Sequence, residues 1–181
     1  HAPDRVLQRR VAVKHVRSTE LTVKDGLRVI LNETRVLRKL RGSPFAVECL
    51  GVFLDQEFHM VFTLAHCDLR SAFETPSPSV DTMWRLGGQL SAAIAHLHEH
   101  RVLHRDLTPS NVLLDVAKWK VRVCDFGLAR LFSEEEWRDL HAAPSAPKPL
   151  ARTLTYTVVT AAYRAPEACI SRDVAYLSPI P

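Results

Sequence analysis

The sequence predicts an α/β (α+β) fold with two lobes: a small lobe built from a sheet and one helix, and a larger, mainly helical lobe. The first observation is a helical periodicity over 22–41, bracketed by short β-prone runs at 10–16, 47–54 and 57–64. The second is the helix-breaking stretch "TPSPS" at 75–79, after which a longer helical pattern begins. The change from sheet-rich to helix-rich sequence indicates where the two lobes meet.

The helical pattern at 22–41 carries one carboxylate on its apolar face. Spacings of three and four residues place Ile30, Leu37 and Leu40 on one side of the helix, and Glu33 lies in the same stripe. A buried carboxylate is costly unless a cation or hydrogen-bond donors meet it. We therefore expect Glu33 to have a cationic partner.

The second lobe begins with a long predicted helix. Its buried face is predicted to hold Met83, Leu90, Ile94 and Leu97. Two glycines inside it, Gly87 and Gly88, each cost about 1 kcal/mol relative to alanine, so we expect another part of the chain to pack closely against them.

Two further segments are predicted from local patterns. The apolar runs at 112–114 and 120–124 flank a turn and indicate a β-hairpin. Residues 133–153 contain "SEEE", three prolines and several alanines and serines, which is typical of a mobile surface loop. The acidic run at 133–136 is interpreted as a solvated loop face in preference to a docking motif.

Composition narrows the class of protein. The 181 residues are 46% hydrophobic, enough for a sizeable core, and the net charge of +4 is spread without a basic block. Nucleic-acid and membrane partners are therefore not expected, and no run approaches the roughly 18 apolar residues of a membrane span. The four cysteines form no CxxC pair, which favours a reducing, intracellular location, cytoplasmic or nuclear.

Five motifs follow one another in a fixed order. They are "VAVK" ending at Lys14, the helical Glu33, "HRDLTPSN" at 104–111, "DFG" at 125–127 and "APE" at 165–167. In this order they resemble the signature set of the eukaryotic protein kinases. The stretches "HMVFTLAHCDL", "VCDFGLAR" and "VVTAAYRAPE" are similar to the branch of mitogen-activated and cyclin-dependent kinases, and more to the former.

The resemblance implies a two-lobed protein-kinase-like fold with a partial N-lobe at 1–64, a hinge at 65–68 and a partial C-lobe at 69–181. It also implies ATP-dependent phosphorylation of serine or threonine in a protein substrate, with Mg²⁺ as cofactor. These boundaries and activities are what the family suggests for this chain.

The resemblance assigns a role to each charged residue of the motifs. Lys14 would hold the nucleotide phosphates and Glu33 would orient that lysine. Asp125 and Asn111 would bind the two Mg²⁺ ions, and Asp106 would accept or orient the proton of the substrate hydroxyl. The remaining nucleotide contacts would come from Ala12, Phe62, Thr63, Ala65, Asp68 and Leu113. Phe62 would lie behind the adenine, and Thr63 and Ala65 would offer backbone hydrogen bonds. Asp68 would lie near the ribose.

Regulation is implied by position. Thr155 matches the activating phosphothreonine of both kinase groups, and its phosphate would pair with Arg105 and Arg130. An upstream activating kinase is the implied partner. Thr157 stands where mitogen-activated kinases carry the tyrosine of their Thr-x-Tyr motif, and Tyr156 is adjacent.

The sequence also departs from the family pattern. No glycine precedes Lys14, so the expected glycine-rich loop is absent, and the chain ends at Pro181, soon after the "APE" motif. Thr108 stands where serine/threonine kinases usually carry a lysine that contacts the transferred phosphate. Two alternatives therefore stay open: a kinase fragment or pseudokinase that acts by protein binding, and a small-molecule phosphotransferase with the same fold.

Four histidines lie close together in the sequence, at His96, His98, His100 and His104. They are interpreted as helix-surface or packing residues because no carboxylate joins them in a recognised metal-ligand spacing. His104 is expected to brace the backbone of the "HRDLTPSN" loop, as the family suggests.

Overall fold

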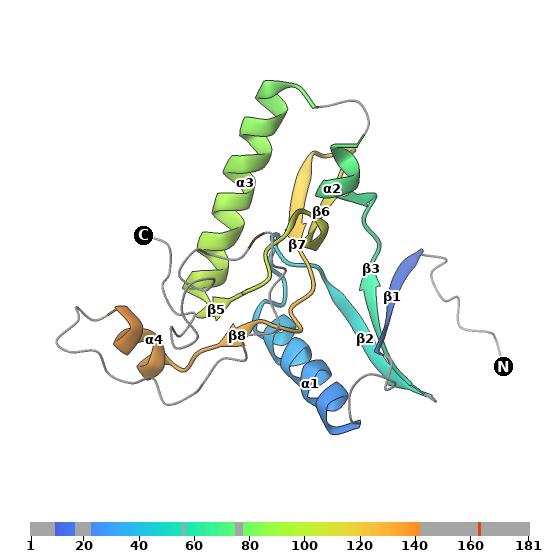
Figure 1. The fold of residues 1–181 in the computed structure, drawn as a ribbon, viewed down its shortest axis with the longest axis vertical. Helices are drawn as coiled ribbons and strands as arrows, with labels where there is room; N and C mark the ends of the chain where they lie inside the picture. The colour runs from blue at the N-terminus through green and yellow to red at the C-terminus, as the bar shows by residue number, and fades with distance from the viewer. Residues whose placement is uncertain (1–9, 17–22, 56, 75–77, 142–162, 164–181) are drawn as a thin grey trace.

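The structure, a computed structural model, describes residues 10–16, 23–55, 57–74, 78–141 and 163. Thr155, Thr157 and the "APE" motif lie outside these residues. In chain order the elements are β1 (Val11–Val16), α1 (Val23–Lys39), β2 (Cys49–Leu54), β3 (Phe58–Thr63), β4 (Cys67–Asp68), α2 (Leu69–Ala72), α3 (Val80–Glu99), β5 (Val102–Leu103), the short 3₁₀-helix η1 (Pro109–Asn111), β6 (Val112–Asp115), β7 (Lys120–Val123), β8 (Arg130–Leu131) and α4 (Glu134–His141) (Figure 1).

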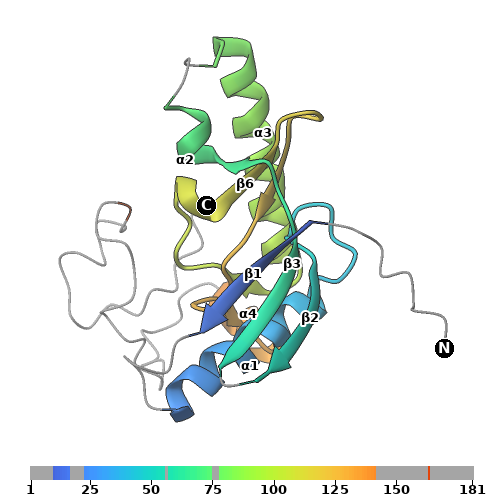
Figure 2. The same cartoon turned by 90° about the vertical axis from the view of Figure 1, so that its right-hand side faces the viewer.

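The N-terminal part is a three-stranded antiparallel sheet with α1 beside it (Figure 2). The strand order is β1-β3-β2, so the central strand β3 is paired on both sides, and Lys14 of β1 lies opposite Met60. The predicted apolar face of α1 is confirmed: Ile30, Leu37 and Leu40 are buried, and Glu33 among them is only 1% exposed.

The C-terminal part is built around the β6–β7 hairpin and α3. Val112 pairs with Val123 in antiparallel register, which confirms the predicted hairpin, and β4 adds a third strand on the β6 side. Leu86 of α3 packs with Leu114 and Val121 of the hairpin. Figure 1 shows α3 standing alongside these strands.

The two parts share backbone hydrogen bonds and one core. Val123 N–H donates to Phe45 O (2.7 Å) and Val47 N–H donates to Val123 O (2.9 Å). The chain after α1 is therefore hydrogen-bonded to β7. The main buried cluster runs from Val36 of α1 to Leu97 of α3 without interruption. Among the helices that the structure describes, not one combines the length and the apolar content that a bilayer crossing demands.

Two expectations for α3 are wrong. Met83 is 45% exposed, whereas the predicted Leu97 is buried and Leu90 packs against the core. Leu86 and Ala93 are buried as well, so the buried face is turned from the predicted stripe toward these two residues. Gly87 and Gly88 are also not closely packed: a Cβ added at either one meets nothing within 4 Å among the described atoms.

The expected surface loop at 133–153 is partly a helix. Ser133 Oγ accepts the N–H of Glu136 (3.1 Å), and Glu136 Oε2 accepts the N–H of Ser133 (2.9 Å), which is a capping box at the start of α4. Trp137 and Leu140 then pack against Leu103 and Phe132. The reciprocal cap and this apolar contact explain why the acidic run folds; residues 142–153 lie outside the described part.

Candidate active site

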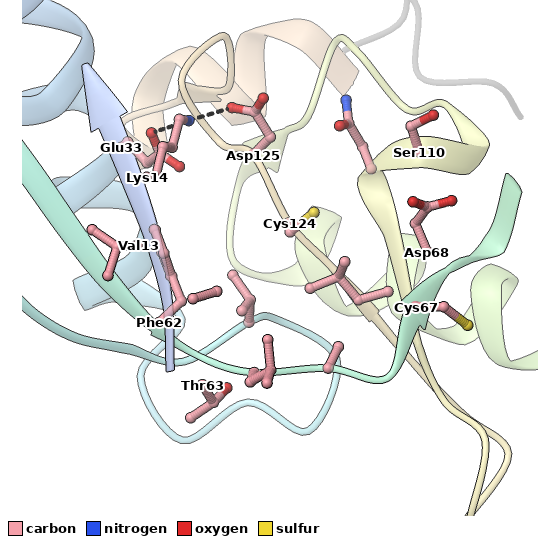
Figure 3. Close-up of a pocket in the computed structure, with 16 residues that line it drawn as sticks. Val13, Lys14, Glu33, Phe62, Thr63, Cys67, Asp68, Ser110, Cys124 and Asp125 are labelled. Carbon is pink, nitrogen blue, oxygen red and sulfur yellow. Dashed lines mark hydrogen bonds and ion pairs between the residues drawn. The ribbon is translucent and has the colours of Figure 1, made fainter. Parts of the chain in front are cut away.

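Three charged side chains from distant parts of the sequence meet at one point. Lys14 Nζ lies 2.8 Å from Glu33 Oε2 and 2.7 Å from Asp125 Oδ1 (Figure 3). The cationic partner expected for Glu33 is therefore Lys14. The same ammonium also reaches the aspartate of the "DFG" motif, so one cation bridges two carboxylates.

The secondary structure explains this convergence. Lys14 projects from β1, Glu33 comes from the buried face of α1, and Asp125 follows β7 in a left-handed conformation with φ of 60°. The next residue, Phe126, is fully buried in the main core and holds the turn in place. A non-glycine residue with positive φ costs energy, so the surrounding packing fixes Asp125 in this orientation.

Charge coupling perturbs the ionisation of all three groups. Burial alone lowers the pKa of Lys14, but the attraction of Glu33 and Asp125 outweighs it and leaves that pKa above its ordinary value. Burial raises the pKa of Glu33, and Lys14 offsets only part of this. Burial also tends to raise the pKa of Asp125, but Lys14 overcomes it, so this pKa falls below its ordinary value. The lysine is held charged and Asp125 is held ionised.

The "HRDLTPSN" loop is anchored by its histidine. His104 Nε2 donates to Cys124 O (2.8 Å), and Asp106 N–H donates to His104 Nδ1 (3.4 Å). Burial lowers the pKa of His104, which favours the neutral ring that these two bonds require. The expected bracing role is confirmed. Asn111 Nδ2 donates to Asp106 O (2.8 Å) and Oδ2 (3.2 Å), so the asparagine and the aspartate are held together.

A cavity of about 490 Å³ opens beside these groups. Its size falls within the usual range for small-molecule sites. It is lined by Ala12, Val13, Lys14, Glu33, Val47, Phe62, Thr63, Leu64, Ala65, Cys67, Asp68, Ser110, Asn111, Leu113, Cys124 and Asp125. Every nucleotide contact and metal ligand expected from the sequence is in this set.

The sequence reasoning missed several lining residues, of two kinds. Ser110 and Cys124 are direct neighbours of the expected Asn111 and Asp125, so their adjacency was a usable signal. Val47 has no such signal, because it enters the cavity wall only through its backbone pairing with Val123.

Comparison with known proteins agrees with this geometry. The chain matches the protein kinase domain over residues 2–180. The chain belongs to the protein kinase family. It is similar to mitogen-activated protein kinase 15 of Rattus norvegicus, with 34% identity over 174 residues that make up 94% of this chain and 30% of that protein.

Two other relatives point to the same branch of kinases. Mitogen-activated protein kinase 12 of Oryza sativa subsp. japonica is 34% identical over 88% of this chain, and extracellular signal-regulated kinase 7 of Drosophila melanogaster is 33% identical over 94%. The matched segment is 26% of the rice protein and 18% of the fly protein. The chain therefore spans less than a third of the length of these curated relatives.

Two residues expected to act in this kinase domain lie outside the cavity wall. Asp106 and Thr108 are not among the lining residues, although Asp106 is tied to Asn111, which is. Thr108 precedes η1 in an extended conformation and is 7% exposed. A buried hydroxyl thus stands where the family pattern has a long cationic side chain.

The two arginines of the expected phosphate site also lie near each other. Arg105 Nε donates to Leu128 O (2.6 Å), and burial, followed by repulsion from Arg130, lowers the pKa of Arg105. Arg130 Nη2 lies 3.3 Å from Glu136 Oε1, and its guanidinium sits 4.3 Å from the centre of the Phe132 ring. Nη1 of Arg130 is buried and has no hydrogen-bond partner in the described part of the chain.

Proposed function

We propose that this kinase domain is part of an ATP-dependent serine/threonine protein kinase of the mitogen-activated type, which transfers the γ-phosphate of ATP to protein hydroxyls. The observation that carries the proposal is the bridge from Lys14 to both Glu33 and Asp125 at the wall of one cavity. Phosphoryl transfer depends mainly on positioning and charge neutralisation, and this bridge supplies both. The relatives named above support the same reaction.

The donor set fits Mg²⁺. Asp125 offers carboxylate oxygens and Asn111 an amide oxygen, and hard oxygen ligands of this kind suit Mg²⁺. The low pKa of Asp125 keeps it ionised at neutral pH. When bound, the metal would neutralise charge on the nucleotide phosphates. Lys14, held charged by its two carboxylates, would bind those phosphates from the side of β1.

The opposite end of the cavity suits a purine. Ala12, Phe62 and Leu113 give an apolar wall, while Thr63 and Ala65 bring backbone groups to the rim. The N–H of Thr63 already donates to Glu48 O (3.1 Å), so a bond from Thr63 to the base has to come from its carbonyl. Asp68 lies at the cavity edge, where it would meet the ribose.

The hydroxyl-activating role goes to Asp106. Its backbone is fixed by His104 and its side chain by Asn111, so it keeps one orientation beside the proposed metal ligand. In this position it would orient the acceptor hydroxyl toward the phosphate.

The test is a nucleotide-binding titration with and without Mg²⁺, followed by phosphate transfer to a protein substrate. We expect Mg²⁺-dependent ATP binding that is lost in Lys14→Met and weakened at least tenfold in Asp125→Asn. Lys120→Met is the matched control, because Lys120 is an exposed residue at the start of β7 and does not line the cavity. Equal binding in all three variants would overturn the proposal.

A second function, an inactive domain that works by protein contact, is favoured by Thr108. Loss of one transition-state charge contact costs about 2.7 to 4 kcal/mol in other enzymes, or roughly 10² to 10³ in turnover. If the domain is an active kinase, Thr108→Lys raises the rate of phosphate transfer without changing ATP affinity. ATP binding with no transfer in either form would select the binding function.

Regulation and partners complete the proposal. Phosphorylation of Thr155 by an upstream kinase would place an anion near Arg105 and Arg130, which repel each other. The partners would be that kinase and the protein substrates, in the cytoplasm or nucleus. The boundaries of the lobes at 64 and of the hinge at 65–68 belong to this proposal as well.

A further inference from the structure

A cluster of two histidines and one glutamate lies at the C-terminal end of α3. Helical spacings of three and four residues place His96, Glu99 and His100 on one face. One possible ligand atom from each lies within 4.8 Å of the others. The interpretation of these histidines as surface or packing residues did not take Glu99 into account, which lies beside two of them.

The protonation of His100 leaves a free lone pair. Its Nδ1 lies 2.9 Å from the backbone carbonyl of His96. A carbonyl oxygen only accepts, so Nδ1 carries the hydrogen and Nε2 of the neutral ring is unprotonated. A histidine that donates one N–H to a backbone carbonyl while presenting the other nitrogen is the usual arrangement of a metal ligand.

His96 has no hydrogen-bond commitment that competes with a metal. Its Nδ1 lies 3.8 Å from Glu99 Oε2, and its Nε2 is buried without a hydrogen-bond partner among the described residues. The rings of His96 and His100 lie with their centres 4.3 Å apart. One ring nitrogen of each histidine thus lies within 4.8 Å of a Glu99 carboxylate oxygen.

The three side chains have to move closer together to hold a cation. Ligands about 2.0 to 2.1 Å from a tetrahedral Zn²⁺ are roughly 3.3 Å apart. The 3.8 Å between His96 Nδ1 and Glu99 Oε2 has to close by about half an ångström, and the other pairs, which lie within 4.8 Å, by about 1.5 Å at most. The Glu99 side chain is 73% exposed and free to make this change. The site also lies at a helix C-terminus, where the backbone carbonyls favour positive charge.

We propose that His96, Glu99 and His100 form a binding site for a late first-row divalent cation, of which Zn²⁺ is the natural probe. Two nitrogen ligands suit such metals and do not suit Mg²⁺, so the site is chemically distinct from the one formed by Asp125 and Asn111. Three protein ligands leave one position for water or another donor. A bound cation would cross-link and stabilise the last turn of α3, four residues before His104. This effect would be independent of catalysis.

The test is a Zn²⁺ titration of the whole chain against a chromophoric chelator, in excess Mg²⁺ to occupy oxygen sites. We expect one Zn²⁺ bound at this cluster, and we expect Glu99→Gln and His100→Gln each to weaken it about tenfold or more. His98→Gln is the matched control, because His98 is in the same turn but contacts Trp137. It is expected to leave Zn²⁺ affinity unchanged.

A second measurement separates this site from the cysteines. Co²⁺ bound to nitrogen and oxygen ligands gives visible absorption without the near-ultraviolet band of cobalt–thiolate bonds, and this spectrum should disappear in Glu99→Gln. Glu99 is mostly exposed, so this variant is expected to fold. Wild-type affinity in Glu99→Gln, equal losses in His98→Gln, or no Zn²⁺ binding at all would each overturn the proposal.

Discussion

Two charged clusters flank the "DFG" segment, and they carry opposite net charge. In the Lys14 cluster one cation meets two carboxylates, Glu33 and Asp125, which leaves one negative charge. The Arg130 cluster holds two cations, Arg105 and Arg130, and one carboxylate, Glu136, which pairs with Arg130, so one positive charge is left. The first is poised to take a cation and the second to take an anion.

The clusters also differ in how firmly they are built. The Lys14 cluster draws on β1, on the buried face of α1 and on the turn after β7, so its members are fixed by the main core. The carboxylate of the Arg130 cluster comes from α4, which rests on the small apolar group that includes Leu103 and Phe132. The ion pairs of the Lys14 cluster therefore contribute to the stability of the core. The carboxylate of Glu136, held by a peripheral helix, is easier for another anion to replace.

The largest expected effect breaks the Lys14 cluster. Lys14→Met leaves the Glu33 carboxylate buried without its cation, and loss of one partner from a buried pair typically costs about 3 to 5 kcal/mol. Since Lys14 is itself partly exposed, we expect about 2 to 3 kcal/mol in the free energy of unfolding, measured with urea. The double variant Lys14→Met with Glu33→Leu should recover most of it. A single variant as stable as the wild type would show that the pair is not part of the fold.

A smaller effect follows from pH. The pKa of Asp125 is depressed by folding, so its stabilisation is present above its unfolded pKa and is lost as pH falls through the folded value. Glu33 has a raised pKa and acts in the opposite sense, losing stabilisation as pH rises through its folded value. We therefore expect Asp125→Asn to flatten the loss of stability on acidification below about pH 4. An unchanged acid limb would contradict this.

The Arg130 cluster should respond more weakly. Glu136→Gln removes the only carboxylate that the described residues bring to Arg130, and the phosphate affinity of the cluster should rise about threefold, as expected for a partly exposed ion pair. Glu135→Gln makes the same charge change on an exposed residue and is the control. Inorganic phosphate titration, followed by the arginine side-chain signals in NMR, measures both. Equal shifts in the two variants would remove the distinction between the clusters.

The smallest effect is on Cys124, next to the Lys14 cluster. Burial, and then the negative charge of Asp125, raise the pKa of its thiol to about 12. Alkylation by iodoacetamide at pH 8 should therefore be slow, and Asp125→Asn should speed it about two- to threefold. Peptide mass spectrometry reads out this cysteine separately. Slower alkylation in Asp125→Asn would contradict the assigned sign.

The Lys14 cluster was predictable because periodicity alone put Glu33 on a buried face, and a buried acid demands a cation. The expected nucleotide and metal contacts of the cavity wall were predictable through motifs that keep their order, whereas Val47 was not. The packing of α3 was not, because the face that meets a hairpin depends on the rotation of the helix, which apolar spacing leaves open around Met83 and Leu86.

Short-range interactions between side chains three or four residues apart were missed in two further places. The capping box of Ser133 and Glu136 outweighed the loop-like composition that follows it, so α4 was missed. At the end of α3, Glu99 lies beside two histidines through helical spacings of three and one residues, which the sequence-based prediction did not use. Both signals are short-range spacings of three or four residues, which composition averages away.

One amide on α1 ties the helix to the segment after "DFG". Asn32 Nδ2 donates to both Gly127 O (3.2 Å) and Ala129 O (2.7 Å), two and four residues after the Asp125 that meets Lys14. An outward movement of α1 would break these two hydrogen bonds together with the Lys14–Glu33 ion pair. The position of α1 and the conformation of the segment after "DFG" are therefore coupled through Asn32 and Glu33.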